Sequence, residues 1–256
     1  MTAATPLPAV FWAHGNPLLT LSDNPYTRAW RALGKRLAPR VILVISAHWV
    51  TTGIQVTGAA WPPTLHDFGG FPQALYDIAY RAPGAPAFAA ELAQRLDASI
   101  DPGRGLDHGA WTVLRHMYPD ASVPVVQLSL DAQRTGDQHY ALGAQLRSLR
   151  NEGVLIMGSG NVVHNLGFYG GAPAAYPWAR RFTDTLRSHL LQKPSGPVCT
   201  PHAWGPDGTL AVPTPEHYWP LLYVLAARDE DEPLSFPTDG FEGGSLSMLS
   251  VLAGSA

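Results

Sequence analysis

The hydrophobic residues of the chain fall into short runs that alternate with longer stretches of helical spacing. The run Arg40–Ala47 is almost unbroken, which is typical of a strand covered on both faces. Shorter runs of the same kind, bounded by Gly, Pro or polar residues, indicate further strands. These are predicted at residues 8–13, 54–57, 123–130, 154–157 and 245–251.

Helical patterns lie between these strands. Asn24 and Pro25 open the first helix, because Asn is a favoured N-cap and Pro fits the first helical position. Residues 193–213 are predicted to form a long loop. Helices are predicted at residues 24–37, 85–96, 108–118, 138–151, 174–192 and 216–228. The alternation predicts a single α/β domain over residues 1–256, with a mostly parallel or mixed central sheet flanked by helices.

Charge and hydropathy limit the classes of partner that the protein is expected to bind. Charged residues make up 14% of the chain, its formal net charge is −3, and no basic run exceeds a pair, so nucleic acid and anionic membrane surfaces are not expected partners. No apolar run approaches the roughly 20 residues of a membrane span. The apolar segment Leu7–Ala13 has no basic residue before it, so we expect no signal peptide and a cytoplasmic location. No pattern in the sequence indicates an oligomeric state.

The chain has ten histidines and one cysteine, Cys199. A disulfide framework and a metal site made of thiolates alone are therefore excluded. A metal of borderline softness would have to be held by imidazole and carboxylate groups.

Three histidines follow buried strands of the predicted sheet. His14 follows the first strand, His48 follows the run that ends at Ala47, and His164 follows the strand that begins at Val154. In an open α/β sheet the carboxyl ends of the strands line the ligand crevice. Any one of these histidines could be structural, but three at one sheet edge predict a site.

Other histidines differ in what their positions indicate. His108 and His217 lie near predicted helix starts, where an imidazole either caps the helix or ligates a metal. His66 lies in a long aromatic and Gly-rich loop that suits a flap over a pocket. His139, beside Asp137, is expected to be solvated. No role is predicted for His116, His189 and His202.

Three imidazoles with open coordination positions suit a catalytic Zn²⁺ site or a mononuclear Fe²⁺ site. Glu216 is adjacent to His217 and could supply the carboxylate of a facial triad. The donor set thus predicts a metal and leaves its identity open.

Six motifs occur together and in order. They are His14-Gly15-Asn16-Pro17, Ser46-Ala47-His48-Trp49, His66-Asp67-Phe68-Gly69-Gly70-Phe71-Pro72, Asp107-His108-Gly109-Ala110-Trp111, Gly158-Ser159-Gly160-Asn161-Val162-Val163-His164-Asn165 and Pro215-Glu216-His217-Tyr218. The set resembles the class III extradiol ring-cleavage dioxygenases, specifically the 4,5-DOPA dioxygenase-like branch. The resemblance extends from about Val10 to Leu249, nearly the whole chain.

The resemblance implies roles for five histidines. It makes His14, His48 and His217 the metal ligands. It makes His164 an acid/base close enough to the metal to act as a fourth ligand, and His108 a second proton-transfer residue. It also implies Fe²⁺ for ring cleavage, with Zn²⁺ able to occupy the site as isolated, and a small aromatic diol and O₂ as substrates.

The residues near these motifs suggest a substrate pocket. Trp49, His66, Phe68 and Tyr218 are expected to contact the substrate, whereas Trp12 fits ordinary core packing at least as well. Few cations adjoin the motifs, and Arg115 and Arg180 are the candidates for binding an anionic substituent.

Two other functions are compatible with the same histidines. One is a Zn²⁺-dependent hydrolase in which His164 acts as the base. The other is a metal-binding protein without turnover.

Overall fold

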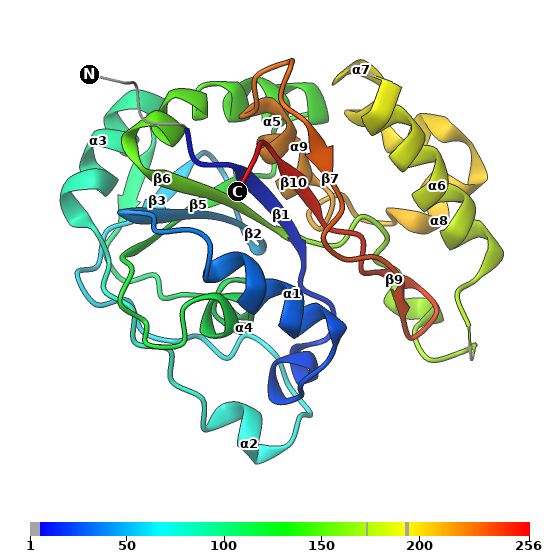
Figure 1. Cartoon of the computed structure of the whole chain (residues 1–256), viewed down its shortest axis with the longest axis horizontal. Coiled ribbons are helices and arrows are strands. Elements are labelled where there is room, and N and C mark those ends of the chain that lie inside the picture. Colours follow the sequence, from blue (N-terminus) through cyan, green and yellow to red (C-terminus); the bar gives the residue numbers. More distant parts are fainter. Residues whose placement is uncertain (1–5, 173, 193–194) are drawn as a thin grey trace.

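The protein is built around one sheet of eight strands (Figure 1). The computed structural model describes residues 6–172, 174–192 and 195–256. The strands lie in the order β4-β3-β5-β2-β6-β1-β10-β7. Their bounds are β1 Ala9–Ala13, β2 Val41–Thr51, β3 Gln55–Thr57, β4 Ser99–Asp101, β5 Val125–Asp131, β6 Val154–Gly160, β7 Leu234–Ser235 and β10 Val251–Ala253. A separate hairpin pairs β8 (Phe241–Glu242) with β9 (Leu246–Ser247).

The sheet is mixed, within the predicted α/β class. Its centre, β5-β2-β6-β1, is parallel. Antiparallel pairs flank this centre on both sides. On one side β3 pairs antiparallel with β5. On the other side β10 pairs antiparallel with β1, and β7 pairs antiparallel with β10. The carboxyl ends of β1, β2 and β6 therefore meet at one edge of the sheet, where a ligand crevice is expected.

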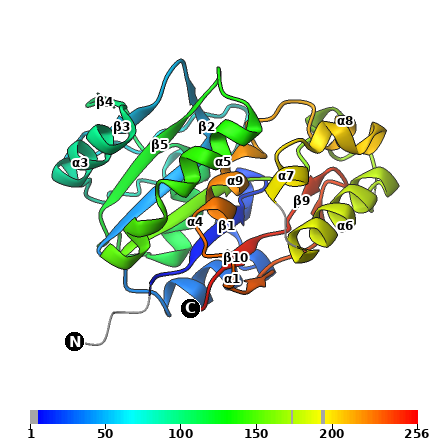
Figure 2. The ribbon, with the colours of Figure 1, turned by 90° about the horizontal axis from the view of Figure 1, so that it is seen from above.

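Both faces of the central strands are buried, because successive side chains enter different cores. In β1, Val10 and Trp12 pack on the side of α1 and α4, whereas Ala9 and Phe11 pack on the side of α9. Figure 1 and Figure 2 show α1 and α4 on one face of the sheet and α3, α5 and α9 on the other. Trp12 is fully buried, as core packing predicts.

The helices agree with the predicted positions in most cases. Asn24 caps α1 by accepting from the N–H groups of Tyr26 and Thr27. None of the described helices is long and apolar enough to cross a membrane. Their bounds are α1 Pro25–Gly34, α2 Gln73–Tyr76, α3 Pro86–Leu96, α4 His108–Met117, α5 Gly136–Ala144, α6 Pro177–Gln192, α7 Ser195–Val198, α8 Pro206–Ala211 and α9 Trp219–Ala226.

One helix prediction and one loop prediction were wrong. The predicted helix 138–151 is divided into α5 and a 3-10 helix, Arg147–Glu152. Leu149 in this 3-10 helix and Leu146, which caps it, lie three residues apart and both pack into the core. The predicted loop 193–213 contains α7, α8 and the 3-10 helix Pro201–Trp204, while residues 193–194 lie outside the described part. Proline at a first helical position begins the last two of these short helices.

Three boundaries near the sheet edge also differ from the predictions. β2 continues to Thr51, so His48 lies inside a strand. α9 begins at Trp219, so His217 precedes the helix. The predicted strand 245–251 is divided into β9 and β10, because Ser250 Oγ, not a backbone carbonyl, accepts the N–H of Ala13 at 3.0 Å.

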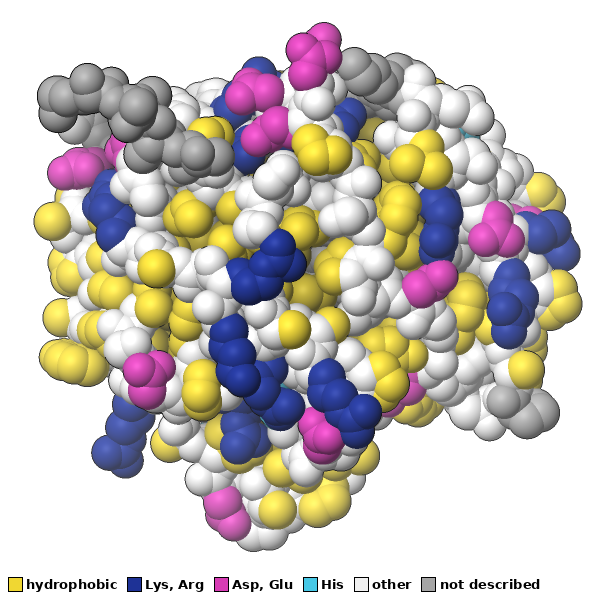
Figure 3. Space-filling view, in the orientation of Figure 1, with side chains coloured by type: hydrophobic (Ala, Val, Ile, Leu, Met, Phe, Trp, Pro, Cys, Tyr) yellow, Lys and Arg dark blue, Asp and Glu magenta, His cyan; other side chains and the backbone are white. Residues whose placement is uncertain are grey.

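One group of cations on the surface lies over the helices of one sheet face. Figure 3 shows Lys and Arg side chains gathered over α1 and α4. Arg28 and Arg31 on α1 are held by Asp23 at 2.8 and 3.2 Å.

Candidate active site

Five histidines line one cavity of about 630 Å³ at the sheet edge formed by β1, β2 and β6. His14 follows β1, His48 lies in β2, and His164 lies four residues beyond the end of β6. The other two come from the helical layer: His108 is the first residue of α4, and His217 lies two residues before α9. The structure thus brings together all five histidines that the sequence singled out at strand ends and helix starts.

An irregularity in β2 places His48. Against β5, the register shifts between Ile45 and Val50, so that the intervening residues leave the regular ladder. Bulges of this kind redirect side chains and recur beside active sites. His48 consequently reaches His14, with 3.2 Å between their Nε2 atoms.

Hydrogen bonds fix which nitrogen of His14 faces the cavity. Ser159 Oγ donates to the carbonyl of Gly109 at 2.6 Å, so its proton is already used. His14 Nδ1, 3.0 Å from the same Oγ, must therefore carry the proton and donate it. This tautomer leaves the lone pair on Nε2, which faces His48.

A carboxylate orients His217 in a similar way. Nδ1 of His217 lies 3.0 Å from Oε1 of Glu216, and the hydroxyl of Thr214 donates to the same oxygen at 2.8 Å. The proton of the neutral imidazole therefore lies on Nδ1. Nε2 of His217 is buried and has no hydrogen-bond partner among the described residues.

His164 stacks on His217. The ring centroids are 3.5 Å apart and the planes are 5° from parallel. The backbone N–H of His164 donates to the carbonyl of Ala211 at 2.9 Å, which anchors the turn after β6 against α8.

Asp67 is a site residue that the sequence reasoning missed. One oxygen, Oδ1, accepts the backbone N–H of His108 at 2.9 Å and lies 3.1 Å from Nδ1 of the same residue, while Oδ2 lies 3.8 Å from Nδ1 of His48. Burial opposes ionisation of Asp67, but the contacts with His108 and His48 outweigh it and lower its pKa to about 2. Its position inside the flap motif, next to His66, was the available signal.

A buried network joins the elements that carry His48 and His108. Asp107 caps α4 and accepts from Ser46 Oγ and Gln127 Nε2, both at 2.7 Å. Arg104 donates to the carbonyl of His48 at 3.0 Å and lies 3.4 Å from Asp107. The rings of His48 and His108 are held with centroids 3.8 Å apart.

Burial and mutual repulsion keep the imidazoles of His14, His48, His164 and His217 neutral. Burial is the main cause that lowers the pKa of His14, His48 and His217 well below the usual value, and neighbouring histidines add to it. Burial and His108 lower the pKa of His164 to about 4, although Glu216 opposes the shift. Near neutral pH these nitrogens are therefore available as ligands or bases.

The donor set fits a metal ion. Ligand atoms of His14, His48 and His108 all lie within 4.8 Å of one another, and those of His164, Glu216 and His217 form a second such group. Two imidazole nitrogens about 2.1 Å from one ion lie about 3.0–3.4 Å apart, and the 3.2 Å between His14 and His48 agrees with this. The unpartnered Nε2 of His217 is the kind of buried atom that a metal satisfies.

The structure gives the four expected substrate residues different positions. Phe68 lines the cavity. Trp49 packs under Arg104, His66 Nε2 lies 3.0 Å from the carbonyl of Ile78, and buried Tyr218 donates to the carbonyl of Val198. None of these three lines the cavity, so their positions do not support substrate contact.

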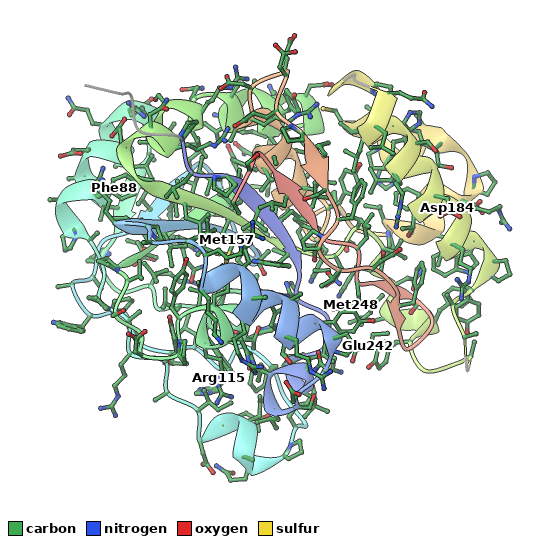
Figure 4. The ribbon with its side chains drawn as sticks, in the orientation of Figure 1. Phe88, Arg115, Met157, Asp184, Glu242 and Met248 are labelled. Atoms are coloured by element: carbon green, nitrogen blue, oxygen red, sulfur yellow. The ribbon has the colours of Figure 1, made fainter. Side chains whose placement is uncertain are left out.

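Other lining residues were not identified from the sequence. Asn16, which belongs to the first histidine motif, is part of the wall, and so are Leu166, Tyr169 and Thr214, which lie within a few residues of a motif. Arg115, labelled in Figure 4, donates to the carbonyl of Thr20, and Arg180 lies over the ring of Phe241. Neither cation lines the cavity.

Comparison with known proteins identifies the family of the chain. Residues 12–248 match the family described as the catalytic LigB subunit of aromatic ring-opening dioxygenase. The chain is 48% identical to 4,5-DOPA dioxygenase extradiol of Escherichia coli (strain K12), over 98% of this chain and 96% of that protein. It is 37% identical to the protein of the same name from Beta vulgaris, over 93% and 92%. A crystal structure of an uncharacterized protein from Escherichia coli K12 matches with a TM-score of 0.85 and 44% identity, covering 97% of this chain and all of the other.

Proposed function

The chain belongs to the family of catalytic LigB subunits of aromatic ring-opening dioxygenases, in its 4,5-DOPA dioxygenase branch, and on that premise we propose roles for its site residues. It is an extradiol dioxygenase, which opens the ring of an aromatic diol with O₂ beside the two hydroxyl groups. We propose a 4,5-DOPA-like catechol as its substrate class, because several relatives carry that substrate in their names.

We assign the metal to Nε2 of His14, His48 and His217. The support is that hydrogen bonds to Ser159 and Glu216 direct the lone pairs of His14 and His217 through Nε2. A ligating imidazole usually donates its other N–H to a carboxylate or another oxygen in this way.

The ion in the working enzyme is Fe²⁺, since Zn²⁺ has no redox chemistry although it suits the same donors. When bound, Fe²⁺ supplies a shared binding point for the diol and O₂ and the electron transfer between them.

His164 is the base that removes a hydroxyl proton from the diol. It lines the cavity, and its lowered pKa, about 4, keeps the imidazole neutral and able to accept a proton. Its planar stacking on His217 argues against a role as fourth ligand, because the lone pairs of two parallel rings do not converge on one point.

His108 is the proton donor when the O–O bond breaks. Asp67 lies 3.1 Å from its Nδ1 and can stabilise the protonated ring, and the N-cap Asp107 fixes the start of α4 from which His108 projects. Phe68 and Phe71 from the flap loop form the apolar wall and exclude water from the ring.

The observation that carries the proposal is the convergence of five imidazoles on one cavity, with hydrogen bonds that fix the tautomers of His14 and His217. The test is anaerobic reconstitution of the full chain with Fe²⁺, followed by a catechol and O₂. A yellow ring-opened product with one O₂ consumed per catechol is expected. No O₂ uptake with several catechols, together with zinc-stimulated ester or amide hydrolysis, would overturn the proposal.

A further inference from the structure

The only formal charge among the described side chains that line the cavity, the histidines aside, is negative. Its described lining contains a carboxylate, Glu216, and no Lys or Arg. A second carboxylate, Glu242, lies directly behind the wall, since a Cβ atom on Gly15 would lie 2.7 Å from its Oε2. Gly15 itself is a lining residue next to His14, so Glu242 is close to the reacting end of the cavity.

Glu242 is part of a polar cluster that reaches the cavity surface. Its Oε2 accepts the N–H of Asn16 at 2.8 Å, and its Oε1 accepts the hydroxyl of Tyr169 at 3.2 Å. The side-chain amide of Asn16 donates to the same hydroxyl at 3.4 Å. Asn16 and Tyr169 both line the cavity, and Tyr169 is 37% exposed. We call Asn16, Tyr169 and Glu242 the acidic rim.

We propose that the acidic rim gives the enzyme a substrate preference. It selects catechols whose side chain ends in a protonated amine over those whose side chain ends in a carboxylate. This inference rests on the dioxygenase function proposed above. An ammonium group at the rim would be attracted by Glu242 and could donate to the hydroxyl of Tyr169. A carboxylate would face the same charge with no described cation in the wall, and placing like charges together is unfavourable.

The two cations that the sequence offered for an anionic substituent lie away from the cavity. Arg115 and Arg180 do not line the cavity, and the group of Lys and Arg side chains at the lower centre of Figure 3 lies over α1 and α4. Figure 4 shows Glu242 beside Met248, on the hairpin side of the molecule and apart from Arg115. Glu216 is less suitable for a test because it also orients His217, so its replacement would disturb the metal site.

The test compares three catechols with side chains of similar size: dopamine, 4-ethylcatechol and dihydrocaffeate. They carry a protonated amine, no charge and a carboxylate, respectively, at about pH 8. With the Fe²⁺-loaded full chain we expect kcat/KM to fall in that order, by at least about tenfold between dopamine and dihydrocaffeate. Glu242→Gln should lower the ratio of dopamine to dihydrocaffeate by about the same factor, whereas the exposed Glu91→Gln on α3 should leave the ratio unchanged.

If Glu242→Gln does not fold, a second variant tests the same inference. Leu166 lines the cavity and is 64% exposed, so Leu166→Arg adds a cation without disturbing the core. It should shift the preference toward dihydrocaffeate. Equal or better cleavage of dihydrocaffeate by the unmodified protein, or an unchanged ratio in both variants, would overturn this inference alone. Cleavage of none of the three catechols would overturn the proposed function and this inference together.

Discussion

The imidazole of His164 lies parallel to that of His217, with 3.5 Å between ring centroids and 5° between planes. The lone pair of an imidazole nitrogen lies in the ring plane. Two parallel planes at this separation do not share a point, so one ion cannot lie in both. This stacking supports a division of roles in which His217 binds the metal and His164 exchanges protons.

The first prediction tests that division. His164→Ala should lower turnover by about 10²- to 10⁴-fold, the usual contribution of a general base, while most of the metal stays bound. His217→Ala should lose the metal. Elemental analysis of the purified variants and O₂ uptake measure the two effects, and exposed His202→Ala serves as the control. Loss of metal from His164→Ala would make His164 a ligand.

The same measurements decide between two ligand sets. The ligand atoms of His14, His48 and His108 also lie close together, so a site containing His108 in place of His217 is geometrically conceivable. We expect His108→Ala to keep the metal and to lose turnover. The opposite pattern, with metal lost from His108→Ala and kept by His217→Ala, would contradict our assignment.

The second prediction concerns Ser159, which is fully buried and accepts the N–H of His14. Ser159→Ala removes the acceptor that fixes the tautomer, so Fe²⁺ or Zn²⁺ should bind about 10- to 100-fold more weakly. Competition with a chromophoric chelator measures the affinity. Ser188→Ala, on the exposed face of α6, should bind the metal as the unmodified protein does. An unchanged affinity of Ser159→Ala would show that the tautomer is fixed by other groups.

The third prediction concerns pH and His139, a residue that we expected to be solvated but that the structure buries completely. Its ring packs against that of Trp219, with 4.3 Å between ring centroids, and its Nδ1 lies 2.9 Å from the hydroxyl of Tyr223. Burial is the main cause that lowers its pKa to about 4.

The unfolded chain then binds more protons than the folded chain between pH 4 and about 6.5. The stabilisation by neutral His139 is therefore complete above about pH 6.5 and is lost as the pH falls toward 4, by up to about 3 kcal/mol. Urea unfolding at several pH values should show a weaker pH dependence for His139→Gln than for the unmodified protein. His202→Gln should leave the dependence unchanged, and equal slopes for all three proteins would refute the prediction.

The fourth prediction concerns the buried side chain of Arg150. It binds Glu232 through two contacts, one of 2.6 Å, and also donates to the carbonyls of Leu7 and Ala227. Arg150→Met should lower the free energy of unfolding by about 3 kcal/mol, because it leaves a carboxylate and two carbonyls without their donor. Thermal and urea unfolding measure the loss. Exposed Arg81→Met is the matched control, and a loss below about 1 kcal/mol would show that water replaces the guanidinium.

Features set by neighbouring residues could be read from the sequence. The α/β class followed from the alternation of runs, and the start of α1 followed from Asn24 and Pro25, because strand periodicity and capping act over a few residues. The five cavity histidines were identified because the sequence placed each after a predicted strand or near a predicted helix start, and parallel strands bring such ends to one edge.

Features that depend on contacts between distant segments could not be read in this way. The bulge that redirects His48 and the division of the last strand at Ser250 both depend on pairing partners far along the chain. The burial of His139 depends on the packing of α5 against α9, which no local pattern encodes. Asp67 was missed because its two histidine partners lie in β2 and α4.

By itself, the sequence determined the set of imidazoles, the sheet edge at which they gather and the family that they resemble. The tertiary structure decided which nitrogen of His14 and His217 faces the cavity, which aromatic residues line it, and which sign of charge surrounds it. The physical reason is the separation along the chain of the residues that determine each feature. Hydrophobic periodicity and capping are properties of consecutive residues, whereas a tautomer and a wall of the cavity depend on atoms that folding brings together from residues such as Ser159 and Gly109, 50 positions apart.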